Sequence, residues 1–145
     1  MHQGGAQAMN AIQLSKFLGW FSLGLGALEL VASRRIAAAL GIATPGLVQA
    51  FGVREIAAGL MVLNKPDTAM PVWGRVIGDA MDAAVLVTGL GYHNRQRGQA
   101  AAALLFVMGA TALDMAVASA LSQREQAALR TARRTRVQRS RTIQA

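Results

Sequence analysis

Four apolar stretches, separated by short polar segments, dominate the pattern of the chain. They span residues 17–33, 47–63, 72–91 and 100–121. Each stretch is apolar all round with only isolated charges, whereas a helix on the surface of a soluble protein keeps a polar face. About 20 apolar residues are enough for a helix to cross the hydrocarbon core of a bilayer. The pattern predicts an all-α fold, a four-helix transmembrane bundle with short loops.

The polar segments set the expected domain organisation. Gly/Pro-rich or polar loops separate the four runs, and a basic segment follows the last one. We expect residues 1–16 to be a disordered or interfacial N-terminus, residues 17–121 to form the membrane domain, and residues 122–145 to form an Arg-rich cytoplasmic tail. Two alternatives stay open: a soluble helical bundle with buried ion pairs, and a first run that is a cleaved signal peptide. Glu29, inside the first run, argues against the signal peptide.

Composition supports closely packed membrane helices. Hydrophobic residues make up 53% of the 145 positions, yet only seven are aromatic and 15 are glycine. Small residues allow helix backbones to approach each other in a membrane. The chain has no cysteine, which excludes disulfides, thiolate chemistry and Cys-ligated metal sites.

The net charge of +8 comes largely from one end of the chain. Seven of the fifteen basic residues fall within the last 22 positions, and no aromatic residues are interleaved with them. Nucleic-acid binding would gain from such aromatics, so we expect no nucleic-acid partner. A basic cluster directly after a membrane helix favours anionic lipid headgroups, although a solvated disordered end is the alternative. The arginines expected at the headgroups are Arg130, Arg133, Arg134, Arg136, Arg139 and Arg141.

Charged residues inside the apolar runs fall on particular helix faces. In the third run Arg75, Asp79 and Asp82 are spaced i, i+4, i+7, which places them on one stripe and predicts an Arg75–Asp79 pair within the helix. The acids of the other runs share stripes with small or hydroxyl-bearing residues, the face that packs inward. We predict one buried polar network near the middle of the bilayer. Its members are Glu29, Arg54, Glu55, Arg75, Asp79, Asp82 and Asp114.

The same stripes predict contacts and a charge imbalance. We expect Arg54 to pair with acids of neighbouring helices, first Asp79 and Asp82. Five acids and two arginines would leave a net charge of −3 if all were ionised, which a low-dielectric interior disfavours. Protonated acids, a bound cation or substrate, or a partner residue must compensate, unless the network is purely structural. Close helix packing is expected at Gly26, Gly52, Gly59 and Gly78.

No catalytic or metal-binding motif is evident. The chain has no nucleophile elbow, phosphate loop or dinucleotide fingerprint. His2 and His93 lie in a terminus and a loop, without a second ligand at helical spacing. We therefore expect no catalytic residue, no metal and no cofactor.

Three segments, "LGWFSLGLGALELVA", "GLVQAFGVREIAAGLMVL" and "WGRVIGDAMDAAVLV", together resemble a small bacterial four-helix membrane domain of unknown function. This domain occurs alone or fused ahead of a cyclase/dehydrase-type, START-like domain, and more broadly the chain is similar to the DoxX-like families. The resemblance covers residues 18–121, with G-x-R-E at 52–55 and R-x-x-G-D-x-x-D at 75–82 as its strongest marks. An Arg-rich tail stands where the fused form has its START-like domain. The resemblance implies the fold and an accessory role beside quinone-linked oxidoreductase complexes.

Two classes of function compete. The favoured one is an integral membrane accessory or scaffold subunit, not an enzyme, that holds a lipid or quinone or anchors a partner complex. The alternative is a small proton-coupled carrier or membrane enzyme that uses the surplus acids. We expect a multi-pass protein of the bacterial inner membrane with a membrane-protein partner or a second copy. The basic tail predicts cytoplasmic termini, although the arginines of the opposite loops favour the reverse.

Overall fold

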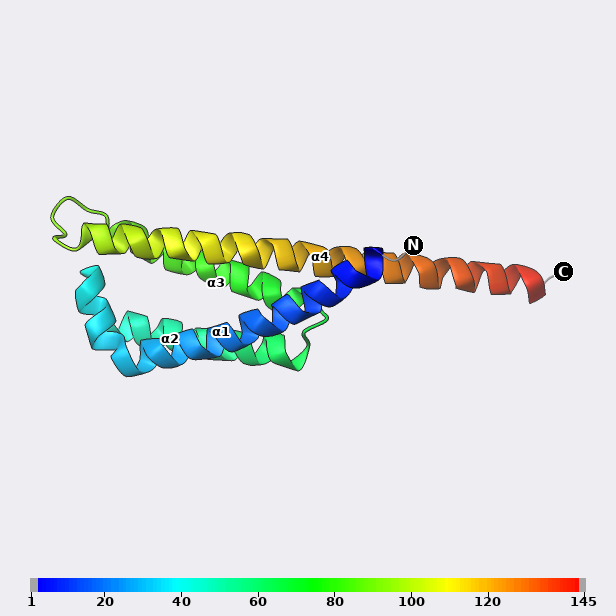
Figure 1. Cartoon of the computed structure of the whole chain (residues 1–145), viewed down its shortest axis with the longest axis horizontal. Helices are drawn as coiled ribbons and strands as arrows, with labels where there is room; N and C mark the ends of the chain where they lie inside the picture. Colours follow the sequence, from blue (N-terminus) through cyan, green and yellow to red (C-terminus); the bar gives the residue numbers. More distant parts are fainter. Residues whose placement is uncertain (1–2, 144–145) are drawn as a thin grey trace.

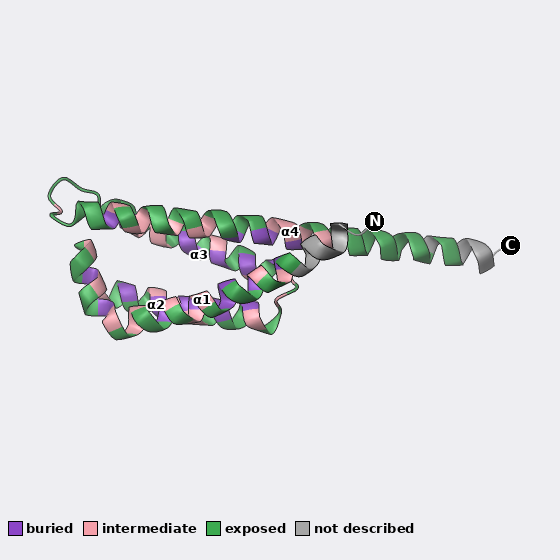
Figure 2. Ribbon diagram, in the orientation of Figure 1, coloured by how far each residue is buried: buried purple, intermediate pink, exposed green. Residues whose placement is uncertain are grey.

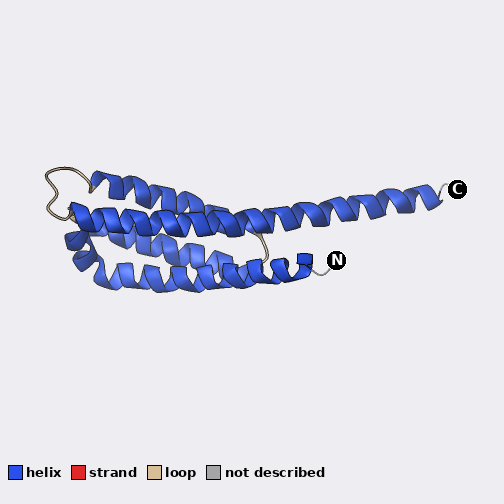
Figure 3. Cartoon of the chain, turned by 45° about the horizontal axis from the view of Figure 1, so that its top comes forward, coloured by secondary structure: helices blue, strands red, loops and turns tan. Residues whose placement is uncertain are grey.

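A computed structural model describes residues 3–143, with side chains described for residues 10–136 and 138–139. Over this range the chain forms four helices joined by loops and has no strand, which confirms the all-α, four-helix prediction (Figure 3). The helices are α1 (Gln3–Leu40), α2 (Pro45–Asn64), α3 (Ala69–Thr88) and α4 (Arg97–Ile143).

The helices form two antiparallel pairs that face each other (Figure 1). The closest contacts are those of α1 with α2 and of α3 with α4. Glycines explain the first contact: a Cβ on Gly26 would lie 2.5 Å from the backbone oxygen of Gly52, and one on Gly59 would lie 2.7 Å from that of Gly19. Three of the four glycines expected at close-packing positions therefore lie in this contact, and Gly19 joins them.

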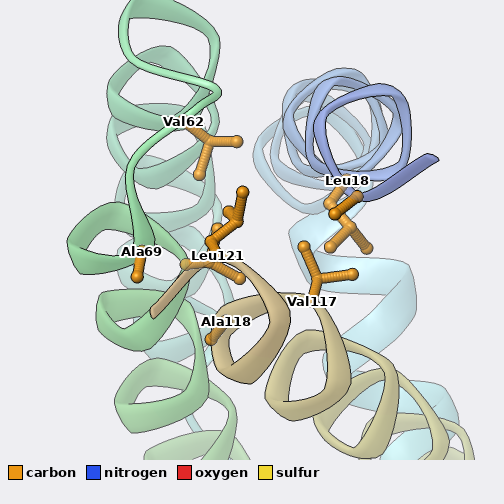
Figure 4. Packing of buried hydrophobic residues seen from close by; sticks show 8 residues of the cluster. Leu18, Val62, Ala69, Val117, Ala118 and Leu121 are labelled. Carbon is orange, nitrogen blue, oxygen red and sulfur yellow. The ribbon is translucent and has the colours of Figure 1, made fainter. Parts of the chain in front are cut away.

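A dry core fills the end of the bundle near both termini. All four helices contribute small or branched apolar side chains to it (Figure 4). Beside this core, the carboxylate of Glu125 accepts a hydrogen bond from the backbone N–H of Ala69 at 2.9 Å and so caps the start of α3. The buried members of this core are Ala11, Leu18, Val62, Ala69, Val72, Val117, Ala118 and Leu121.

The opposite end of the bundle carries the α1–α2 and α3–α4 loops. Gly41 ends α1 with a φ of +67°, a left-handed conformation that glycine adopts without strain, and Pro45 starts α2. The Asn94 side-chain amide donates to the backbone oxygens of Leu40, at 3.0 Å, and Gly89, at 2.7 Å. Asn94 thus ties the end of α1 to the end of α3.

Two expectations about the chain ends need correction. Residues 3–16 belong to helix α1 and not to a segment apart from it, and Ala11 and Ser15 in this stretch are buried. Residues 122–143 are not a separate segment but the straight continuation of α4, and residues 125–136 of this continuation are exposed (Figure 2). Residues 1–2 and 144–145 of the predicted termini lie outside the described residues.

Three of the helices are long and apolar enough to cross a membrane. These stretches are Asn10–Leu40, Pro45–Asn64 and Arg97–Arg136. The remaining helix, α3, is as long as α2 but carries three charged residues. Large apolar side chains also cover the outside of the bundle, for example Val31, which is 90% exposed, and Leu105, which is 71% exposed. Such a surface is what lipid-facing helices present.

Candidate functional site

The Arg75 guanidinium joins three helices in the interior. Its side chain, on α3, is only 1% exposed. Nη1 donates to Oε2 of Glu55 on α2 at 3.0 Å, and Nε donates to Oδ2 of Asp114 on α4 at 2.9 Å. Among the described residues no ion pair joins Arg75 to Asp79, so the predicted within-helix pair is wrong. The long side chain instead reaches buried acids on neighbouring helices, where a charged hydrogen bond contributes more than at an exposed surface.

Arg54 links α2 to α3. Its Nη2 donates to Oδ2 of Asp82 and to Oε1 of Glu55, both at 2.7 Å. Asp82 is thus the neighbouring-helix partner, whereas Asp79 forms no ion pair with Arg54 within the described part of the chain. Gly78 makes room for this arrangement, since a Cβ there would lie 2.7 Å from Cζ of Arg54. Its role is therefore to admit a guanidinium, and not to allow two helix backbones to touch.

Glu55 is the centre of the network. Its Oε2 accepts from the hydroxyl of Ser22 on α1 at 2.6 Å and from Arg75, while Oε1 accepts from Arg54. Both carboxylate oxygens are therefore engaged, and the group is almost fully buried. The adjacent Arg54 and Glu55 of the G-x-R-E motif thus bind to each other and to two other helices.

Two acids of the network have no arginine partner among the described residues. Asp79 accepts a hydrogen bond from the Thr111 hydroxyl at 3.2 Å. Glu29 keeps one oxygen, Oε2, buried without a hydrogen-bond partner within the described chain.

The contacts therefore leave the charge imbalance in place. The two arginines form four ion pairs, which engage three acids: Glu55, Asp82 and Asp114. With all five acids ionised, the interior would keep three uncompensated negative charges. Buried uncompensated charge is costly, so protons or a positively charged group must balance it.

A cavity of about 210 Å³ lies against this network. Its walls are apolar side chains from all four helices, including Leu25, Ile36, Phe51 and Phe106. Polar side chains form its floor. These floor residues are Glu29, Glu55, Arg75, Asp79 and Asp82.

The cavity occupies the half of the bundle toward the two loops that Asn94 joins. Its wall residues Ile36, Leu86 and Ala103 lie near the end of α1, the end of α3 and the start of α4. The dry core closes the other half. The sequence did not predict the cavity, because its wall residues are as apolar as residues that face lipid or pack in a core.

The acidic floor does not favour a metal ion. Carboxylate oxygens of Glu55, Asp79 and Asp82 lie within 4.8 Å of one another, a spacing that could hold a cation. However, both oxygens of Glu55 and one of Asp82 already accept from guanidinium or hydroxyl donors. A divalent ion would have to compete with those donors and sit beside two positive charges.

The predicted headgroup arginines lie far from this site. Exposed side chains on the extension of α4 include Arg130, Arg133, Arg134, Arg136 and Arg139. The side chain of Arg141 lies outside the described residues. The structure therefore separates the candidate lipid-binding residues from the buried network.

No protein-family model matches the chain, and no curated protein or solved structure matches it either. The similarity to DoxX-like domains therefore stays a prediction from the sequence. The features of the chain that bear on its function are the buried network and the cavity beside it.

Proposed function

We propose that this chain is a non-catalytic integral membrane protein that holds one small amphipathic molecule between its two helix pairs. The observation that carries the proposal is the cavity, which has apolar walls and a polar floor. Pockets for small molecules typically combine a largely apolar lining with a few placed polar groups. A lipid or quinone head of modest size fits this description, as the resemblance to DoxX-like domains implies.

Insertion of all four helices into a bilayer is part of the proposal. Three helices have the length and composition for it, and α3 directs Arg75, Asp79 and Asp82 toward partners on other helices. Charges satisfied in this way are tolerated within a membrane protein, because they do not face lipid. Both ends of the described chain lie at the same end of the bundle (Figure 1), as an even number of crossings requires.

We place that end in the cytoplasm of a bacterial cell, with the bundle in the inner membrane. The reason is the excess of arginines on the α4 extension, which positive-inside behaviour favours. A reporter enzyme fused to the C-terminus, active only on the periplasmic side, tests this orientation. Reporter activity would reverse the assignment.

Ligand holding is tested by blocking the cavity. Ala103 lines the cavity on α4, whereas the adjacent Ala102 is exposed on the same helix. We expect protein purified in mild detergent to carry a small molecule detectable by native mass spectrometry, and Ala103→Trp to abolish it. Ala102→Trp adds the same side chain outside the cavity and should keep the molecule. Equal loss or equal retention in the two variants would contradict the proposal.

An accessory role also implies a partner. We propose a membrane-protein partner or a second copy of the chain, because large apolar side chains remain exposed over the bundle. Isolation in mild detergent, followed by identification of co-purifying proteins, distinguishes the two. A monomer that carries no other protein would remove the scaffold part of the proposal.

The second candidate is a proton-coupled carrier. The observation in its favour is the excess of three acids over arginines in the buried network. A proton relay needs carboxyl groups that can exist neutral inside the membrane. Against it stands the dry core, whose buried side chains are all apolar and lie at the terminal end of the bundle. Proton or solute uptake into proteoliposomes that Asp82→Asn abolishes would favour the carrier.

A further inference from the structure

We infer that the molecule held in the cavity carries a positively charged, hydrogen-bond-donating head, an organic ammonium group, and not an acidic head. This inference rests on the proposed function, since it requires that the cavity hold an amphipathic molecule. It specifies which chemistry the polar floor recognises.

Two acceptor atoms of the lining residues are buried and unpaired. Oε2 of Glu29 and Oδ1 of Asp82 are buried, and neither has a hydrogen-bond partner in the described part of the chain. Arg75 is the one cationic residue that lines the cavity, and two of its three nitrogens, Nε and Nη1, already donate to Asp114 and Glu55. A further unpaired donor, Nη1 of Arg54, belongs to a residue that does not line the cavity. The carboxylates with unpaired oxygens that line the cavity therefore lie on α1 and α3.

The excess of acids over arginines around the cavity also favours a positively charged head. Four acids and one arginine line it, and the whole network holds five acids against two arginines. A carboxylate or phosphate head would add negative charge to a site that already has too much. An ammonium head instead removes one uncompensated charge and brings three N–H donors, enough for both Glu29 and Asp82.

The apolar walls decide between an organic and an inorganic cation. A bare metal ion gains nothing from Leu25, Phe51 and Phe106, and the oxygens of Glu55 that it would need are already engaged. An alkyl or aryl amine places its carbon chain against those walls. A cavity of about 150 Å³ holds a benzene molecule, so 210 Å³ suits an amine with a short apolar chain.

The experiment compares three probes that share an eight-carbon chain. Octylamine, octanol and octanoate are titrated into the full-length purified protein in mild detergent, and binding is measured by native mass spectrometry. We expect octylamine to bind at least about tenfold more tightly than octanoate, with octanol between them. Ala103→Trp should remove binding of all three, which places the bound probe in the cavity.

Two floor variants test the recognising groups. Glu29→Gln breaks no described ion pair and is expected to fold, while Asp82→Asn leaves Arg54 its bond to Glu55. Each should weaken octylamine by about tenfold and leave octanol nearly unchanged. Asp67→Asn, which removes a carboxylate from an exposed loop, serves as the matched control and should change neither.

The outcomes distinguish the preference for an ammonium head from the ability of the cavity to hold an amphipathic molecule at all. Octanoate binding as tightly as octylamine would overturn the ammonium inference while the cavity still holds an amphipathic molecule. An octylamine preference that survives both Glu29→Gln and Asp82→Asn would also overturn it. Failure of all three probes to bind would contradict the proposed function itself.

Discussion

Arg75→Met removes the cation that joins α2, α3 and α4 while keeping an unbranched side chain of similar length. The two acids it binds are affected differently. Glu55 keeps its bonds from Ser22 and Arg54. Asp114, which is fully buried, loses the one arginine that contacts it in the described chain. The variant therefore leaves one carboxylate stranded in the interior.

The size of the effect follows from that stranded group. Removing one partner of a buried ion pair typically costs about 3–5 kcal/mol, because the other charge stays buried without compensation. We expect Arg75→Met to lower the free energy of unfolding by this amount. Asp114→Asn removes the stranded charge, so the double variant should regain at least about 1.5 kcal/mol relative to the sum of the two single changes, within the range of directly contacting residues.

Unfolding in mixed micelles with increasing SDS provides the assay. Trp20 on α1 and Trp73 on α3 report on both helix pairs, and the Trp73 indole donates to Ser122 on α4 at 3.2 Å. Arg34→Met, which removes an exposed arginine of α1, is the control and should stay within about 0.5 kcal/mol of the unmodified protein. Strictly additive costs in the double variant would refute the reasoning, because they would mean that Arg75 and Asp114 do not interact.

Three further predictions concern packing, the loops and the α4 extension. Gly52→Ala places a Cβ 2.7 Å from the backbone oxygen of Gly26 and should lower the free energy of unfolding by about 1–3 kcal/mol. A Cβ on Gly74 meets nothing within 4 Å, so the control Gly74→Ala should be neutral or stabilising. Equal thermal midpoints of the two variants would contradict this. Asn94→Ala removes both amide bonds to Leu40 and Gly89, so hydrogen exchange should rise in both loops, while Gln99→Ala, at an exposed position, should leave it unchanged. Replacing Arg130, Arg133 and Arg134 by glutamine should reduce enrichment of anionic lipid around the protein in mixed-lipid nanodiscs, by about 1 kcal/mol for each arginine near the surface, and added salt should have the same effect; unchanged enrichment would mean that these arginines are merely solvated.

Helical periodicity predicts well which face a charge occupies. Glu55, Asp82 and Asp114 share stripes with small or hydroxyl-bearing neighbours, and all three lie in the interior. Periodicity does not determine the partner, as Arg75 shows. The i, i+4 spacing favours Asp79, but the side chain is long enough to choose between its own helix and two others, and the burial of Glu55 and Asp114 decides the outcome.

Two other features lie beyond what the sequence determines. Gly78 has the same appearance as Gly26 or Gly52 in the sequence, yet it faces a guanidinium and not a backbone. The cavity arises from how far apart the helix pairs stand, which depends on contacts distant in sequence. Only its floor was predictable, because buried charges are rare enough to identify one by one.

Helix α4 runs without a break from the cavity to the exposed extension, so a movement at one end can be passed to the other. One uninterrupted helix contributes Phe106 to the cavity wall, Ala118 to the dry core and Arg136 to the exposed extension. At a rise of 1.5 Å per residue, Phe106 lies about 18 Å from Ala118, and Arg136 lies about 27 Å from it on the other side. If α4 pivots as a rigid rod at the tightly packed Ala118, a ligand that pushes the wall outward by about 1 Å displaces Arg136 by about 1.5 Å in the opposite direction. The occupancy of a buried site would then be transmitted, amplified, to a charged surface that a partner can contact.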